Sequence, residues 1–190
     1  MALTSQQIIA LQCIPGCGSK TIRNITDFAK DLSIETASEF ACMVNECIQR
    51  KIASRIKNNI SIEDATEYLD KADYIIEKSL DYGIHVTNYQ EENFPKMLLE
   101  TIDESGKPDI PIIIFYKGYL SITQKPDIAI IGISEPTLDG TKAGTFLGKL
   151  FTNKGYNIVS GLAAGCDTAG HKGALSSFNV KNYCIPCPWT

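Results

Sequence analysis

The sequence lacks any apolar run that approaches the ~20 residues needed to span a bilayer, and its N-terminus lacks the charged flank and apolar segment of a signal peptide. It also lacks a net positive charge, because 22 acidic residues outweigh 18 lysines and arginines and leave a net charge of −4. The first absence predicts a cytoplasmic protein with no membrane partner. The second excludes a uniformly basic nucleic-acid binder, so any contact with nucleic acid must come from a local patch.

The cysteines lack the even number and regular spacing of a disulfide framework. There are seven, scattered over positions 13, 17, 42, 47, 166, 184 and 187, and this pattern predicts reduced thiols. Cys184 and Cys187 have the spacing of half a zinc site. The other half is missing, so we predict neither a metal site nor a cofactor.

The first part of the chain, residues 1–82, has the pattern of an all-helical domain. A capping box at Thr4–Gln7 begins a helix that runs to about Gln12, and Ile14–Gly18 ends it. A second helix follows from Ser19 to about Lys30. Helix, Pro-Gly-x-Gly, helix is typical of a helix-hairpin-helix unit, in which backbone N–H groups hold DNA phosphates, with Lys20 and Arg23 placed to help. The alternative is a helical hairpin that only packs.

Two further helices complete this domain. One is predicted from Ala37 to about Lys57; near its end stand four cations, Arg50, Lys51, Arg55 and Lys57, a cluster more typical of a solvated face than of a binding site. The other begins at a second capping-box-like sequence at Ser61 and ends at about Tyr82, where Gly83 supplies the stop.

From residue 83 to 190, strand patterns alternate with helices. The predicted strands are 84–87, 111–118, 127–133, 157–159 and 180–185, with a helix over 141–153 and a surface loop over 104–110. This alternation predicts the α/β class, with a helical, helix-hairpin-helix-like domain followed by a partial Rossmann-like parallel sheet.

One stretch, residues 157–175, has the layout of an anion site: a strand, a turn of small residues and a helix. Gly161 and Gly165 let a phosphate approach the main chain. The residues expected to help are the Ser160 hydroxyl, Asp167 at the helix start, and His171 and Lys172 one turn later. The strand before it ends in Gly132, so the two turns are expected to converge on one pocket. The alternative is an ordinary tight turn of an α/β protein.

The run SGLAAGCDTAGHKGAL, residues 160–175, resembles the signature of the DNA-processing protein A family (DprA/Smf). Phe94-Pro95 with Leu98, and the segment 111–118, are similar to two further family segments. The resemblance implies a non-enzymatic protein that binds incoming single-stranded DNA and loads a RecA-type recombinase during natural transformation. It assigns nucleic-acid or phosphate binding to Gly132, Ser134, Ser160, Gly161, Leu162, Ala163, Gly165, Asp167, His171 and Lys172.

The sequence departs from the family at the first strand. Family members place an arginine that grips phosphate where this chain has Ser134, and Glu135 adds a negative charge beside it. Losing such a contact costs about 1.5–3 kcal/mol, and Lys142 and Lys172 are the candidates to compensate. This departure keeps open a nucleotide-signal sensor on the same fold. A nucleotide-processing enzyme such as a phosphoribohydrolase is less favoured, because only Asp167 and His171 could serve it.

The resemblance also implies another sheet strand and more sheet beyond it, where this chain has the residues after Lys181. We hypothesise a frameshift there, which makes the chain truncated within the Rossmann-like domain; the rivals are a naturally short protein or an excised domain. In the family the later sheet carries the homodimer contact and the partner surface. The homodimer of the family is therefore doubtful for this chain. The alternative to a DNA-binding protein is a truncated, non-functional product.

Overall fold

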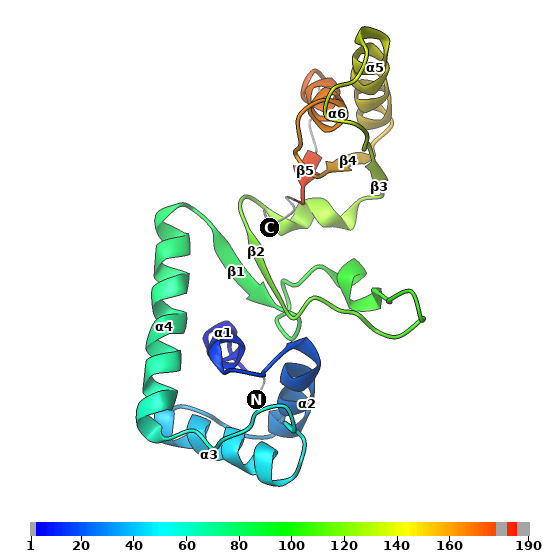
Figure 1. Cartoon of the computed structure of the whole chain (residues 1–190). Helices are drawn as coiled ribbons and strands as arrows, with labels where there is room; N and C mark the ends of the chain where they lie inside the picture. Colours follow the sequence, from blue (N-terminus) through cyan, green and yellow to red (C-terminus); the bar gives the residue numbers. More distant parts are fainter. Residues whose placement is uncertain (1–2, 178–181, 186–190) are drawn as a thin grey trace. The chain divides into compact units, whose positions relative to one another are not determined.

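The computed structural model describes residues 3–177 and 182–185, and the chain divides into two compact units between Leu120 and Ser121. The elements of the first unit are α1 (Ser5–Cys13), α2 (Ser19–Ala29), α3 (Ala37–Gln49), α4 (Ile62–Asp81), β1 (His85–Asn88), the 3-10 helix η1 (Lys96–Glu100) and β2 (Ile113–Tyr116). After η2 (Leu120–Gln124), the second unit has β3 (Asp127–Ala129), α5 (Leu138–Asn153), β4 (Asn157–Ser160), α6 (Cys166–Leu175) and β5 (Asn182–Cys184) (Figure 1). Within the described residues, no helix has the length and apolarity to cross a membrane.

The helix starts of the first unit follow from local hydrogen bonds. At the start of α1, the Thr4 hydroxyl accepts a hydrogen bond from the backbone amide of Gln7, and the Gln7 side chain accepts one from the backbone amide of Thr4. Ser61 and Asp64 form the same pair of hydrogen bonds at the start of α4. Gly83 follows α4 at φ +67°, the left-handed conformation that ends helices. The core of this unit surrounds α1, whose Ile8 and Leu11 are fully buried.

The third helix is shorter than the sequence predicts. It ends at Gln49 rather than at about Lys57, and Lys51 takes a left-handed φ of +62°. The backbone amides of Ile52 and Ala53 both donate hydrogen bonds to the Cys47 carbonyl. Ala53, at the end of this turn, is fully buried.

The first unit extends past the predicted border at residue 82, because the two antiparallel strands β1 and β2 pack on α1 and α4. Asn88, fully buried on β1, donates to the Ser5 hydroxyl at the start of α1 (3.1 Å) and to the Glu91 carboxylate (2.7 Å). Residue 82 therefore marks a change of secondary structure, while the compact unit continues to Leu120. The helix-hairpin-helix assignment remains a prediction.

In the second unit, β3, β4 and β5 form a parallel sheet in that order. β3 ends at Ala129, earlier than the predicted Ile133, although the Ile130 amide still donates to the Val159 carbonyl at 3.1 Å. At the opposite end, the Asn157 side chain donates to Asp127 at 2.8 Å, and the Tyr183 hydroxyl donates to the same carboxylate. These bonds fix the register of the three strands.

The helices α5 and α6 pack closely together and both contact β4, so they lie on one side of the sheet (Figure 1). Their contact is made by glycines. A Cβ on Gly148 would collide with the Gly170 carbonyl, and a Cβ on Gly173 would collide with the Thr145 carbonyl. The two backbones thus touch directly, and this contact sets the position of the start of α6.

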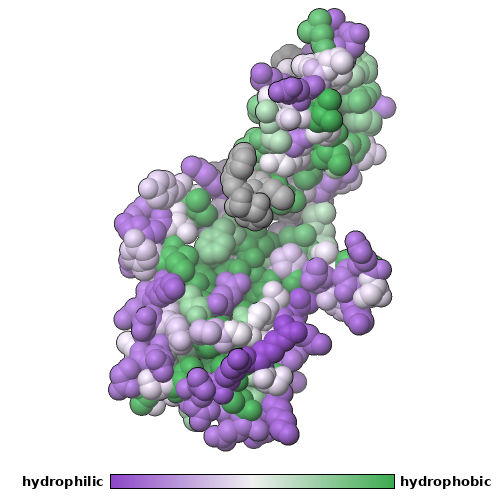
Figure 2. Space-filling model, in the orientation of Figure 1, coloured by the Kyte–Doolittle hydropathy of each residue, from purple (hydrophilic) through white to green (hydrophobic). Residues whose placement is uncertain are grey.

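Apolar side chains are exposed on the second unit. On α5, Leu138 and Phe146 are 72% and 65% exposed. Figure 2 shows apolar surface in green on the unit that carries this helix.

Candidate phosphate-binding site

The ends of β3 and β4 meet through their backbones. The Cys166 amide, at the start of α6, donates to the Ile133 carbonyl at 3.1 Å. Gly165 has φ +82°, and a Cβ there would collide with the carbonyls of Ile133 and Ser134. On the other side, a Cβ on Gly132 would lie 2.6 Å from the Cys166 sulfur. Both glycines are thus required by close approach, and the two turns are in direct contact; the predicted pocket between them remains a prediction.

Ser160 joins the two strand ends instead of facing outward. Its side chain is buried, and its hydroxyl donates to the Ile130 carbonyl at 2.5 Å. Its own carbonyl accepts from the Ile185 amide at 2.9 Å. The expected role as a hydroxyl donor to a ligand is therefore not supported, since that hydrogen is already engaged.

Asp167 occupies two of the amides that the sequence assigns to an anion. Its Oδ2 accepts from the Gly161 amide at 3.1 Å and from the Ala163 amide at 3.3 Å, and the residue is buried. Between these amides, Leu162 adopts φ +63° and leaves its side chain 58% exposed. Asp167 thus does more than complement the helix dipole: its carboxylate takes the place of the expected phosphate at Gly161 and Ala163. An aspartate at the helix start is the one feature of the sequence that could have predicted this bond.

His171 does not lie on the rim of the turn. It is buried one turn after Asp167, and its Nε2 has no hydrogen-bond partner among the described residues. Burial lowers the pKa of His171 below its usual value, and the neighbouring Asp167 opposes this only in part. A neutral, buried imidazole supplies no positive charge to an anion.

The remaining predicted residues are exposed, and those of the two turns, 132–134 and 161–164, form the rim of the site. Gly132, Ser134, Gly161, Leu162, Ala163 and Lys172 are exposed. The amides of Leu162 and Ala164 have no acceptor among the described residues, so they can donate to a ligand. Lys172 stands six residues into α6, about 9 Å along the axis from its start. Lys142 is 3.6 Å from Asp139, an exposed pair of little strength.

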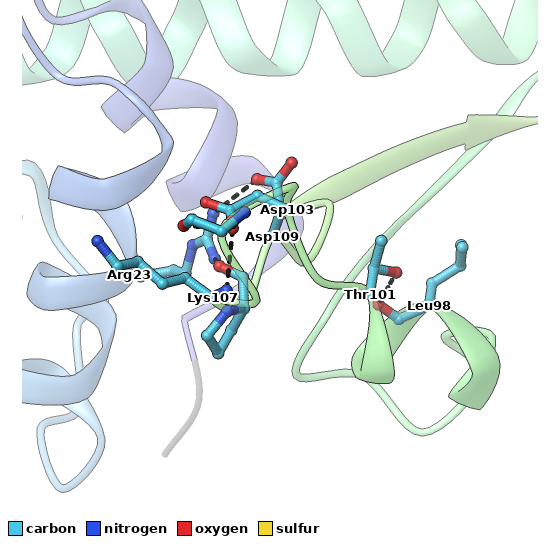
Figure 3. A network of polar contacts seen from close by, with 8 residues as sticks. Arg23, Leu98, Thr101, Asp103, Lys107 and Asp109 are labelled. Atoms are coloured by element: carbon cyan, nitrogen blue, oxygen red, sulfur yellow. Dashed lines mark hydrogen bonds and ion pairs between the residues drawn. The ribbon is translucent and has the colours of Figure 1, made fainter.

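Arg23, which the sequence predicts to help hold a DNA phosphate, instead contacts another segment of the chain. Its guanidinium donates to the Pro108 carbonyl at 3.0 Å and lies 3.6 Å from Asp109 (Figure 3). The segment 104–110 is therefore folded against α2, where a turn capped by Asp103 holds it through the amides of Ser105 and Lys107. Arg23 anchors this loop, while Lys20 remains exposed.

Within the described residues, no three His, Cys, Asp or Glu side chains gather in the way that a metal ion requires. Cys184 lies on β5, and Cys187 falls outside the described residues.

Comparison with known proteins gives a consistent picture. The family model described as DNA recombination-mediator protein A matches residues 85–185, more than half of the chain. DNA processing protein DprA of Streptococcus pneumoniae is 38% identical over 69 residues, 36% of this chain and 24% of that protein. DprA of Bacillus subtilis is 27% identical over 126 residues, 66% of this chain and 39% of that protein. Protein Smf of Escherichia coli is 27% identical over 129 residues, 66% of this chain and 33% of that protein.

The fold has a solved counterpart as well. The X-ray structure of DprA from Streptococcus pneumoniae matches with a TM-score of 0.63 at 22% identity, over 98% of this chain and 58% of that one. This likeness confirms the α/β class, with helices and a small parallel sheet. The chain spans between 24% and 39% of the length of these three curated relatives.

Proposed function

The chain belongs to the DNA recombination-mediator protein A family, and from this premise we propose that it binds single-stranded DNA for DNA processing in natural transformation. The observation that carries the proposal is the joined pair of strand ends, where the Ser134 turn and the exposed 161–164 loop meet. Loading of a RecA-type recombinase is the finer part of the proposal, and it rests on the family name alone.

The DNA backbone is held at the rim, outside the clamp made by Asp167. Phosphate oxygens accept from the amides of Leu162 and Ala164, and Lys172 supplies charge. These donors carry no base information, so binding is independent of sequence and weakens as salt rises. Asp167 and Ser160 hold the loop in place for this contact.

Binding, rather than catalysis, is the role that the side chains support. The two candidates for acid–base chemistry are Asp167, which is held by two amides, and His171, which is buried. Both side chains are buried, so neither is placed to exchange a proton with a ligand on the exposed surface. The relatives are named as DNA processing proteins.

A second candidate, a nucleotide-signal sensor, is favoured by the acidic balance and by exposed Glu135 beside Ser134. A small nucleotide requires one phosphate group at the rim and not a run of them. Thermal-shift measurements with mononucleotides and with oligothymidine separate the two functions. Stabilisation by mononucleotides alone favours the sensor.

The decisive experiment restores the missing cation. In a mobility-shift titration with a single-stranded oligonucleotide at two salt concentrations, Ser134→Arg is expected to bind about ten- to a hundredfold more tightly than the wild type, since a charge-assisted contact contributes about 1.5–3 kcal/mol. Asn153→Arg is the matched control, because it adds the same charge at an exposed position at the other end of α5. Equal gains in the two variants would show that the ligand lies elsewhere.

A further inference from the structure

The loop between α1 and α2 is fastened to the segment that follows α3. Gly16 takes φ +87°, and a Cβ there would collide with the Arg55 carbonyl. On α2, the Asn24 side chain donates to the Ile52 carbonyl at 3.5 Å. Figure 1 shows the chain after α3 returning beside α2. Two stretches that are some 35 residues apart in the sequence therefore form one surface.

This surface concentrates positive charge. Lys20 lies in the first turn of α2, and Lys51, Arg55 and Lys57 lie on the segment after α3; all four are exposed. Among the residues that the structure describes, none of the four takes part in an ion pair. Arg50 differs, because it is held 2.6 Å from Glu46 and stacks over Phe28. We call these four free cations the hairpin basic surface.

Backbone donors lie beside the cations. α2 begins after Gly18 with no side-chain cap, so its first amides have no partner from a capping side chain. Gly18 and Ser19 are exposed, and nothing lies within 4 Å of the place of a Cβ on Gly18. The uncapped start of α2 is thus exposed, two residues after the point where Gly16 meets Arg55.

The composition of the surface decides what it reads. Large exposed aromatic side chains occur on α4 and beyond, with Tyr74 the first along the chain, and residues 14–57 contribute none. Without a stacking platform, the surface cannot select unpaired bases. Dispersed, exposed cations instead neutralise a polyanion and release its counterions.

We propose that the hairpin basic surface binds the phosphodiester backbone of DNA without reading bases, and so takes duplex as readily as single strands. The family match begins at residue 85 and leaves this surface unassigned. The proposal stands apart from the site at the ends of β3 and β4. It gives the chain a second contact with DNA, carried by the first unit alone.

The test measures binding of the full chain to a 20-base-pair duplex by fluorescence anisotropy at several salt concentrations. The triple variant K20E/R55E/K57E is expected to lose at least tenfold in affinity at the lowest salt. The slope of log Kd against log salt should fall by about 2–3, because each phosphate contact contributes about 0.9. Lys51 is left in place.

K71E/K96E/K117E is the matched control, with the same charge change at three exposed lysines of the same unit. It should keep the wild-type salt slope. Equal losses in both variants, or no duplex binding by the wild type at 50 mM salt, overturn the proposal. If the first variant melts at a lower temperature, the neutral K20Q/R55Q/K57Q must show the same fall in slope. Ser134→Arg, which concerns single strands at the other unit, should leave the duplex slope unchanged, so the two proposals fail separately.

Discussion

Replacing Asp167 by alanine removes the carboxylate that holds the amides of Gly161 and Ala163. Hydrogen bonds to a charged acceptor contribute about 1.5–3 kcal/mol each. Here both hydrogen bonds share one acceptor, the Asp167 Oδ2, at 3.1 and 3.3 Å. The loop is exposed, so water can replace part of the hydrogen bonding that the two amides lose. We therefore expect a loss of about 2–4 kcal/mol in the free energy of unfolding of the second unit. Asp167→Asn keeps one neutral acceptor and should lose about half as much.

The measurement is urea unfolding followed by far-UV circular dichroism. With an m-value of about 2 kcal/mol/M, the alanine variant should unfold at about 1–2 M less urea. Asp139→Asn is the control, because Asp139 also lies in a first helical turn but is 94% exposed, 3.6 Å from Lys142. That change should shift the midpoint by less than about 0.25 M.

Added inorganic phosphate provides a second readout of the same reasoning. Removal of the carboxylate exposes two amides, so phosphate should stabilise Asp167→Ala more than the wild type. A variant that unfolds like the wild type would refute the clamp. A variant that is destabilised yet gains nothing from phosphate would show that the loop needs Asp167 to keep its shape.

Two further predictions concern titratable groups. Burial lowers the pKa of His171 below its usual 6.5, so its contribution to stability is present above pH 6.5 and is lost as the pH falls through the lowered value. The urea midpoint should therefore drop between pH 7 and pH 5 by more in the wild type than in His171→Leu. Equal drops in the two proteins would contradict this. Burial raises the pKa of Cys17 to about 12, whereas Cys42 is exposed. Iodoacetamide at pH 8 should therefore alkylate Cys42 well before Cys17, as followed by peptide mass spectrometry. The reverse order would disprove the buried position of Cys17.

Sequence alone predicted best what depends on near neighbours. The starts of α1 and α4 follow from capping boxes that span three residues, Thr4 to Gln7 and Ser61 to Asp64. The predicted end of α3 was wrong, because the helix ends at Gln49 and the chain then turns, with Ala53 buried. Helical spacing cannot show such a tertiary preference.

The site illustrates the same limit. Strand–turn–helix patterning predicted the meeting of the β3 and β4 ends, since parallel strands direct their carboxyl ends to one edge. It could not tell whether the turn amides are vacant, because an aspartate near a helix start complements the dipole and can also reach back over six residues to Gly161. Likewise, Arg23 and Asp109 are 86 positions apart, and no local pattern links them.

The glycine contact between α5 and α6 divides the second unit into positions that can vary and positions that cannot. Any side chain at Gly148 or Gly173 would push the helices apart and displace the start of α6. Ser134 and Leu162, by contrast, are exposed on the same scaffold. The exposed positions of the two turns can thus change their side chains by single substitutions, while the frame that presents them stays unaltered.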